Sequence, residues 1–195
     1  MTGKTMKKNA LNEEDTYGVL VSPGTIQFKR LLPGPIERVW DYLTNPEKTK
    51  LWMGGGTFDL RVGGLCEWHC DYAFNLEPEI RKKHNGVIPV IYGRILELEP
   101  PRLFKMTWDY SDCVNTSQDG SKSEITFELF PQEQNVLLVL THSGMPNNHD
   151  IRAALAGWHV HIDILSDTLS NVPSAPFMSA HEALEIEYKK RIKGD

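Results

Sequence analysis

The segment Cys66-Glu67-Trp68-His69-Cys70 places four side chains of zinc-binding types within five residues. The surrounding pattern predicts a strand, in which successive side chains point to opposite faces. Cys66, Trp68 and Cys70 then share one face, and Glu67 and His69 share the other. Two cysteines four positions apart on a strand are too far from each other to hold one zinc ion. We therefore expect packed thiols here, with no metal and no other cofactor.

Three further histidines, His142, His159 and His161, carry side chains that exchange protons near neutral pH. His159 and His161 lie about 200° apart on a predicted helix, so they cannot bind one metal ion together. His142 ends a predicted strand, where we expect its ring to hydrogen-bond the backbone of the following turn. The sequence shows no partner for any of the three. It therefore predicts structural roles for them and identifies no catalytic residue.

The aromatic residues are numerous enough to line an interior. Core packing accounts for most of them, but aromatic walls with a few polar groups are also typical of small-molecule sites. Trp158, in the middle of a predicted long helix, is the strongest single candidate for a pocket wall. The expected wall of a ligand cavity comprises Trp52, Trp68, Tyr92, Trp108, Tyr110, Trp158, His161 and Ile162.

Polar groups that would face the same interior are fewer. Glu67, His69, Glu97 and Asp109 are the candidates, although alternation along a strand allows each of them to face solvent instead. Gly54-Gly55-Gly56 lacks the following Lys-Ser/Thr of a phosphate-binding loop, and we expect a flexible loop there. The sequence contains no nucleophile elbow, dinucleotide fingerprint or metalloprotease motif.

Composition narrows the class of protein. The chain has 195 residues, of which 40% are apolar and 24% charged, as in an ordinary globular protein. A net charge of −5 argues against nucleic acid as the main partner. No apolar run approaches the ~18 residues of a membrane-spanning helix. Three cysteines and the lack of a signal-peptide pattern indicate reduced thiols in the cytoplasm.

Hydrophobic periodicity predicts strands followed by a long helix, which indicates an α+β fold with helices on one face of an antiparallel sheet. We expect a flexible segment over 1–16, one domain over 17–171, and a linker with a tail helix over 172–195. Loops are expected over 73–86 and 111–122. The predicted elements are a strand over 25–32, helices over 36–43 and 46–52, strands over 58–62, 65–72, 87–99, 102–110, 123–130 and 136–141, a long helix over 150–169, and a helix over 179–192.

The predicted long helix has two apolar stripes on opposite sides. The first should face the sheet, and it consists of Ile151, Leu155, Trp158, Ile162, Leu165 and Leu169. The second contains Ala153, Gly157, Val160 and Ile164, and the close approach of another backbone would explain the glycine. We expect the tail helix to cover this second face through Phe177, Ala180, Leu184 and Tyr188. If the tail leaves it uncovered, a homodimer through Gly157, Val160 and Ile164 is expected.

The order and spacing of several motifs resemble the heat-shock-protein-90 ATPase activator homologue family, which belongs to the SRPBCC, START-like (birch-pollen-allergen-like) superfamily. The matching pieces are F-x-R-x-L-x-x-P-x-x-x-V-W-x-x-L-T-N-P from Phe28 to Pro46, Trp52 before a glycine loop, Val62-Gly63-Gly64, G-R-I-L-E-L-E-P-P-R-L from Gly93 to Leu103, L-T-H-S-G from Leu140 to Gly144, and the Gly157-Trp158 pair. The resemblance implies a helix-grip fold, in which a curved antiparallel sheet of about six to seven strands wraps round the long C-terminal helix.

The resemblance also implies a cavity between sheet and helix. We expect the chain to bind a hydrophobic small molecule there, and to be a binding protein rather than an enzyme. Two alternatives stay open: a cyclase- or hydrolase-like enzyme that uses an inward histidine or carboxylate in that cavity, and a chaperone-cofactor or other protein-interaction role. These functions rest on analogy at the level of fold.

Overall fold

A computed structural model describes residues 16–71, 82, 88, 90–110 and 123–193, with residues 109 and 110 described by their backbone alone. Almost all of the expected flexible segment 1–16 lies outside these residues, as do the loop over 111–122 and most of the loop over 73–86. The side chains of Asp109 and Tyr110 also lie outside the description.

A single antiparallel sheet of eight strands forms the body of the protein, in the order β1-β2-β8-β7-β6-β5-β4-β3. Six strands match predicted ones. The strand predicted over 58–62 is displaced, since β3 (Gly56–Phe58) shares only Phe58 with it. The edge strand β1 was not predicted because all four of its side chains are exposed and show no alternation. The strands are β1 (Val19–Ser22), β2 (Thr25–Pro33), β3 (Gly56–Phe58), β4 (Leu65–His69), β5 (Val90–Glu99), β6 (Leu103–Tyr110), β7 (Ser123–Gln132) and β8 (Asn135–Ser143).

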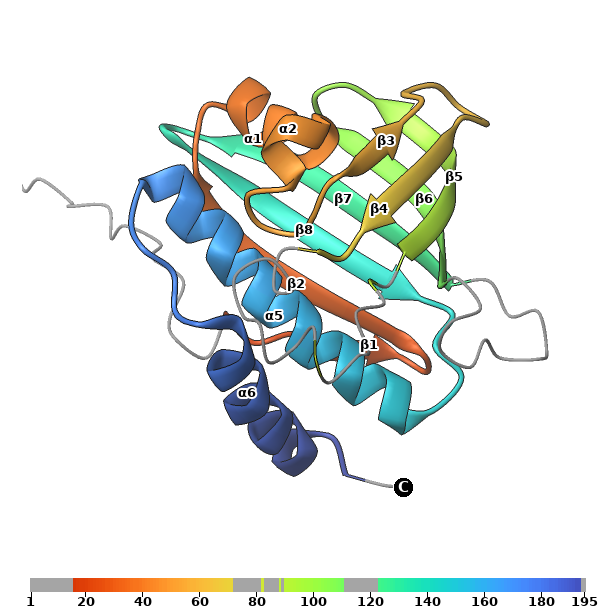
Figure 1. The fold of residues 1–195 in the computed structure, drawn as a ribbon, viewed down its shortest axis with the longest axis vertical. Coiled ribbons are helices and arrows are strands. Elements are labelled where there is room, and N and C mark those ends of the chain that lie inside the picture. The colour runs from red at the N-terminus through yellow and green to blue at the C-terminus, as the bar shows by residue number, and fades with distance from the viewer. Residues whose placement is uncertain (1–15, 72–81, 83–87, 89, 111–122, 194–195) are drawn as a thin grey trace, which may run out of the picture.

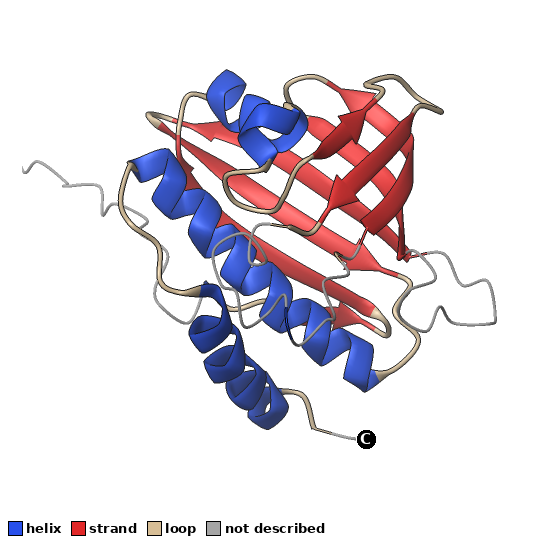
Figure 2. Ribbon diagram, in the orientation of Figure 1, coloured by secondary structure: helices blue, strands red, loops and turns tan. Residues whose placement is uncertain are grey.

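The helices lie against the sheet as the helix-grip arrangement requires. Two short helices, α1 (Ile36–Thr44) and α2 (Pro46–Thr49), follow β2, and the long helix α5 (Asn148–Ser170) follows β8. Figure 1 shows α5 running along β2 and the tail helix α6 (Phe177–Arg191) lying beside α5. Figure 2 shows the sheet curling toward the side on which α5 lies. The predicted fold class is confirmed.

The sheet-facing stripe of α5 explains why this helix is held so firmly. Its six members, from Ile151 to Leu169, are all buried in the main core. The helix begins at a cap in which the Asn147 side chain accepts a hydrogen bond from the Asp150 backbone N–H at 2.9 Å. It ends at Asn171, whose φ of 56° is the left-handed conformation that closes many helices.

The tail covers the C-terminal part of the second face of α5. Val160 and Ile164 are buried, and Phe177, Ala180 and Leu184 of the tail pack against the core. Ala153 is exposed and Gly157 is half-buried, so the predicted cover is only partial. The homodimer through this face stays a prediction.

The expectation about Gly157 is wrong. A Cβ placed on this residue would meet none of the described atoms within 4 Å, so no described backbone approaches it closely. Gly157 lies on the second face of α5, beyond the part that the tail covers. Packing therefore does not require a glycine at this position.

The glycines after α2 are not the flexible loop that was expected. Gly54 and Gly56 lie against β4, where an added Cβ would come within 1.7 Å of the His69 carbonyl oxygen and 1.8 Å of the Glu67 carbonyl oxygen. Their φ angles of 153° and 152° also favour glycine. Gly55 is held by the Asp71 carboxylate, which accepts its N–H at 3.1 Å. This segment is fixed, and it places Trp52 beside β4.

A buried polar group fastens the tail to the rest of the fold. The Tyr188 hydroxyl accepts the Gly18 backbone N–H at 2.9 Å, so its own proton is available for Nδ1 of His159 on α5, 2.8 Å away. The other ring nitrogen of His159 faces Asp163, which pairs with Arg30 of β2 at 2.9 Å. One tail residue thus connects α6 to α5 and to the chain just before β1.

Candidate functional site

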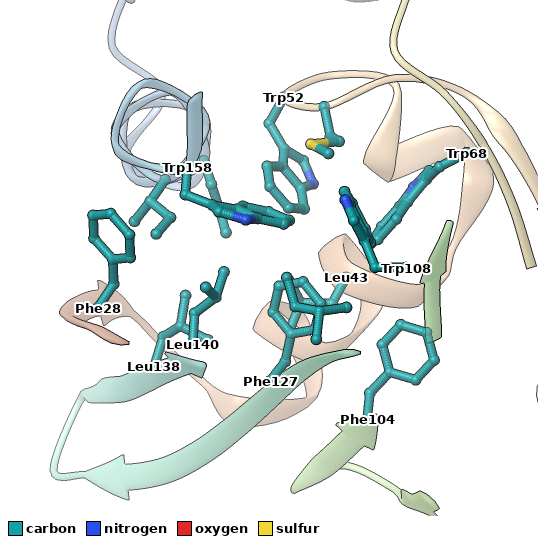
Figure 3. Packing of buried hydrophobic residues seen from close by; sticks show 14 of the residues in the cluster. Phe28, Leu43, Trp52, Trp68, Phe104, Trp108, Phe127, Leu138, Leu140 and Trp158 are labelled. Atoms are coloured by element: carbon teal, nitrogen blue, oxygen red, sulfur yellow. The ribbon is translucent and has the colours of Figure 1, made fainter. Parts of the chain in front are cut away.

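Five aromatic rings from five different segments meet between the sheet and α5 (Figure 3). Trp68 on β4 contacts Trp108 on β6 with ring centroids 5.5 Å apart, and Trp108 contacts Trp158 on α5 at 5.1 Å. Trp52 lies 6.4 Å from Trp68, and Phe127 on β7 lies 5.9 Å from Trp158. We call Trp52, Trp68, Trp108, Phe127 and Trp158 the aromatic cluster. All five rings are buried.

Strand alternation and helix periodicity bring these rings to one place. Cys66 and Trp68 are the buried positions of β4, and Met106 and Trp108 are buried positions of β6. Four of the eight predicted wall residues, namely Trp52, Trp68, Trp108 and Trp158, therefore lie together. Ile162 is buried on the same stripe of α5 as Trp158.

Trp52 is held in place by two hydrogen bonds. Its indole N–H donates to the Tyr42 carbonyl oxygen at 2.8 Å, and its own carbonyl oxygen accepts Nδ1–H of His161 at 2.8 Å. His161 also contacts Phe177 of the tail, with ring centroids 5.1 Å apart. The predicted wall residue His161 therefore lies at the border between the cluster and the tail.

The prediction that Tyr92 lines the interior is wrong. Tyr92 is 48% exposed on the outer face of β5, because Ile91 and Gly93 occupy the inward positions on either side of it. The eighth predicted residue, Tyr110, lies outside the described side chains.

His142 belongs to the site, although it was not predicted there. Its Nδ1 accepts the indole N–H of Trp158 at 3.1 Å, so it does not hydrogen-bond the turn backbone as expected. Burial lowers the pKa of His142 to about 4, and the ring is therefore neutral at pH 7. The signal for its position was present in the sequence, since Leu138, Leu140 and His142 follow the inward period of β8.

Two buried nitrogen atoms of the site have no hydrogen-bond partner among the described residues. They are Nε1 of Trp68 and Nε2 of His142. Buried polar atoms of folded proteins are nearly always paired, so two such atoms in one aromatic interior call for an explanation.

Acidic groups are directed away from the aromatic cluster. Glu67 and His69 pair with each other at 2.7 Å on the outer face of β4, and the Glu97 side chain is 57% exposed. The sequence left both orientations open for Glu67, His69 and Glu97. They face outward because apolar residues take the inward positions of their strands. In the described part of the chain, the buried polar side chains are Thr44, Thr49, His142 and His159. Among the described residues, His142 therefore has no buried carboxylate beside it, and Asp163 faces His159 instead.

The cysteines behave as packed thiols. Burial, with the Asp59 charge nearby, raises the pKa of Cys66 to about 12, which keeps the thiol protonated. Burial likewise raises the pKa of Cys70 to about 12, with Asp71 adding to the effect. Within the described ranges, no three His, Cys, Asp or Glu side chains are grouped so that they could hold a metal ion.

Two hollows formed by described residues lie away from the aromatic cluster. One, of about 430 Å³, lies between the β1–β2 turn and the segment leading into α5, beside Val21, Met145 and Ile151. The other, of about 230 Å³, lies between α5 and the tail, beside Ile164 and Ala180. Among the described residues, no helix is both long and apolar enough to cross a membrane.

The sequence matches the family described as activator of Hsp90 ATPase homolog 1-like protein over residues 33–170. This range includes α1, the whole sheet from β3 to β8, and α5. The chain belongs to this family. The match confirms the resemblance found in the sequence, and the aromatic cluster and His142 lie within the matched part of the chain.

Several solved structures share the fold of this protein. A protein from Bordetella parapertussis, solved by NMR in solution, is 30% identical, with a TM-score of 0.73 over 91% of each chain. CalU16 from Micromonospora echinospora is 22% identical, with a TM-score of 0.62 over 85% of this chain and 86% of its own. A conserved protein of unknown function from Enterococcus faecalis is 19% identical, with a TM-score of 0.62 over 87% and 86%. The last two show the fold alone. No curated protein matches the sequence.

Proposed function

We propose that this protein binds a hydrophobic small molecule between the sheet and α5, against the aromatic cluster. The observation that carries the proposal is the cluster itself: five rings from β4, β6, β7, α5 and the segment after α2 converge, and two buried nitrogen atoms among them lack a partner in the described structure. Sites for small molecules combine such apolar, aromatic linings with a few polar groups.

The charge of the interior favours binding over acid–base catalysis. His142 is neutral because burial lowers its pKa to about 4, and the described buried side chains include no carboxylate beside it. An acid–base enzyme needs a group that exchanges a proton near the working pH. The free thiols of Cys66 and Cys70 support a cytoplasmic location, so the protein would bind its ligand in that compartment.

The proposal is tested with N-phenyl-1-naphthylamine, a neutral probe whose fluorescence rises in an apolar site. We expect saturable binding to the wild-type chain. Trp158→Leu should weaken it by about tenfold, because the variant loses the ring contacts that α5 makes with a bound aromatic molecule.

Tyr92→Leu is the matched control, since it removes an aromatic ring from the outer face of the same sheet. It should leave the affinity unchanged. The proposal fails if the wild-type chain gives no saturable binding, or if Tyr92→Leu and Trp158→Leu weaken it equally.

A further inference from the structure

The two unpartnered nitrogen atoms in the aromatic interior are both hydrogen-bond donors. Indole Nε1 always carries a proton, so Nε1 of Trp68 is a donor. The ring of His142 is neutral, and its Nδ1 already accepts the Trp158 N–H at 3.1 Å. The single proton of a neutral imidazole must then be on Nε2. The described site therefore contains two buried N–H groups and no acceptor for either.

Both donors lie on the inner face of the sheet and border the same ring. The ring centroid of Trp108 is 5.5 Å from that of Trp68 and 5.9 Å from that of His142. Trp68 is fully buried and His142 is 4% exposed, so solvent does not serve either group. A hydrogen-bond acceptor brought to each N–H would satisfy both groups.

We propose that the ligand is a neutral, flat, largely apolar molecule whose oxygen acceptors meet Nε1–H of Trp68 and Nε2–H of His142. This inference rests on the function proposed above and specifies its ligand class. A carbonyl oxygen suits either donor because it accepts hydrogen bonds and carries no charge.

A charged ligand is the less suitable occupant. The described buried side chains include neither a carboxylate for a cation nor a lysine or arginine for an anion. Moving an unpaired charge out of water is far more costly than burying a carbonyl group that finds donors. Trp68 and His142 are thus assigned as the residues that select acceptor-bearing molecules over plain hydrocarbons.

The test compares 9-fluorenone with fluorene, which share the same three fused rings and differ by one carbonyl oxygen. We expect the wild-type chain to bind fluorenone at least about tenfold more tightly, measured by equilibrium dialysis. In Trp68→Phe, which keeps an aromatic side chain but a smaller one and removes the donor, this preference should fall by about threefold or more.

Tyr92→Phe is the control, because Tyr92 lies on the exposed outer face of the same sheet and takes no part in the site. Its fluorenone preference should equal that of the wild type. A second measurement needs no variant: fluorenone should move the indole N–H resonance of Trp68 downfield in the wild-type spectrum, and fluorene should not.

The possible results distinguish a failure of the ligand-class inference from a failure of the proposed binding function. If neither molecule binds, the proposed function itself fails. If both bind with equal affinity, or if Trp68→Phe keeps the full preference, binding stands and the assignment of Trp68 and His142 is overturned.

Discussion

At the scale of single residues, His142 determines the chemistry of the interior. It accepts the Trp158 N–H and so orients the central ring of α5 against Trp108. The same bond fixes the tautomer that leaves Nε2–H directed into the interior. A histidine on a predicted strand gave no indication of this role, because its partner lies 16 residues away on another element.

His142→Leu should lower the free energy of unfolding by about 1–3 kcal/mol. The leucine fills the space, but the buried Trp158 N–H loses its acceptor. Urea unfolding measures the effect. His149→Leu is the control, since His149 is exposed, and it should change stability by less than about 0.5 kcal/mol. Equal effects of the two variants would show that the buried hydrogen bond contributes nothing.

The buried histidines should make the protein sensitive to acid. Burial lowers the pKa of His142, and of His159, from 6.5 to about 4. Between these values the unfolded chain binds more protons, so the stabilisation is complete above about pH 6.5 and is lost as the pH falls toward 4. Each group should cost on the order of 2 kcal/mol between pH 7 and pH 5.

Urea unfolding at pH 7 and pH 5 checks this dependence. His142→Leu should lose less stability between the two values than the wild type, since one of the titrating groups is gone. An identical loss in both proteins would contradict the lowered pKa of His142.

At the scale of elements, one residue of α5 lowers the stability of the helix and can be replaced. Gly157 is in the interior of the helix, and a Cβ there would meet none of the described atoms within 4 Å. Gly157→Ala should therefore raise the free energy of unfolding by up to about 1 kcal/mol, because alanine loses less conformational entropy in a helix. Thermal and urea unfolding measure the gain.

Gly93→Ala on β5 should have the opposite effect. A Cβ at this position would lie 2.1 Å from Cε of Met106 and 2.4 Å from the Thr107 carbonyl oxygen, so the strand must shift. If Gly157→Ala were as destabilising as Gly93→Ala, a close neighbour of Gly157 would have to exist after all.

The tail helix depends on one hydroxyl group. Tyr188→Phe removes the acceptor for the Gly18 N–H and the partner of His159, both of which are buried contacts. We expect a loss of about 1–3 kcal/mol in the free energy of unfolding. Tyr92→Phe, on the exposed outer face, is the matched control and should be neutral. Amide exchange of α6 in Tyr188→Phe should be faster than in the wild type, and unchanged exchange would refute the role of this hydroxyl.

At the scale of the whole molecule, sequence reasoning went further for the fold than for the site. Periodicity located six strands and four helices, because most of these elements bury one face at a fixed period. It displaced β3, which covers Gly56–Phe58 and has no buried side chain. It missed β1, whose exposed side chains carry no such pattern. The two stripes of α5 correctly indicated that both the sheet and the tail pack on this helix.

The site was predictable only in part. The four tryptophans followed from alternation and helical spacing. Tyr92 was misplaced because alternation along β5 did not determine which of its two faces is the inner one. The Trp158–His142 bond and the free N–H of Trp68 depend on how curved strands converge, and a one-dimensional pattern does not contain that information.

The central claim is that a hydrophobic molecule binds between the sheet and α5. Nuclear Overhauser contacts between protons of bound N-phenyl-1-naphthylamine and the protein test it most directly. The account predicts contacts to the rings of Trp158, Trp108 and Phe127. Contacts confined to Val21 and Ile151, or to Ala180, would instead place the probe in one of the two outer hollows and contradict the claim.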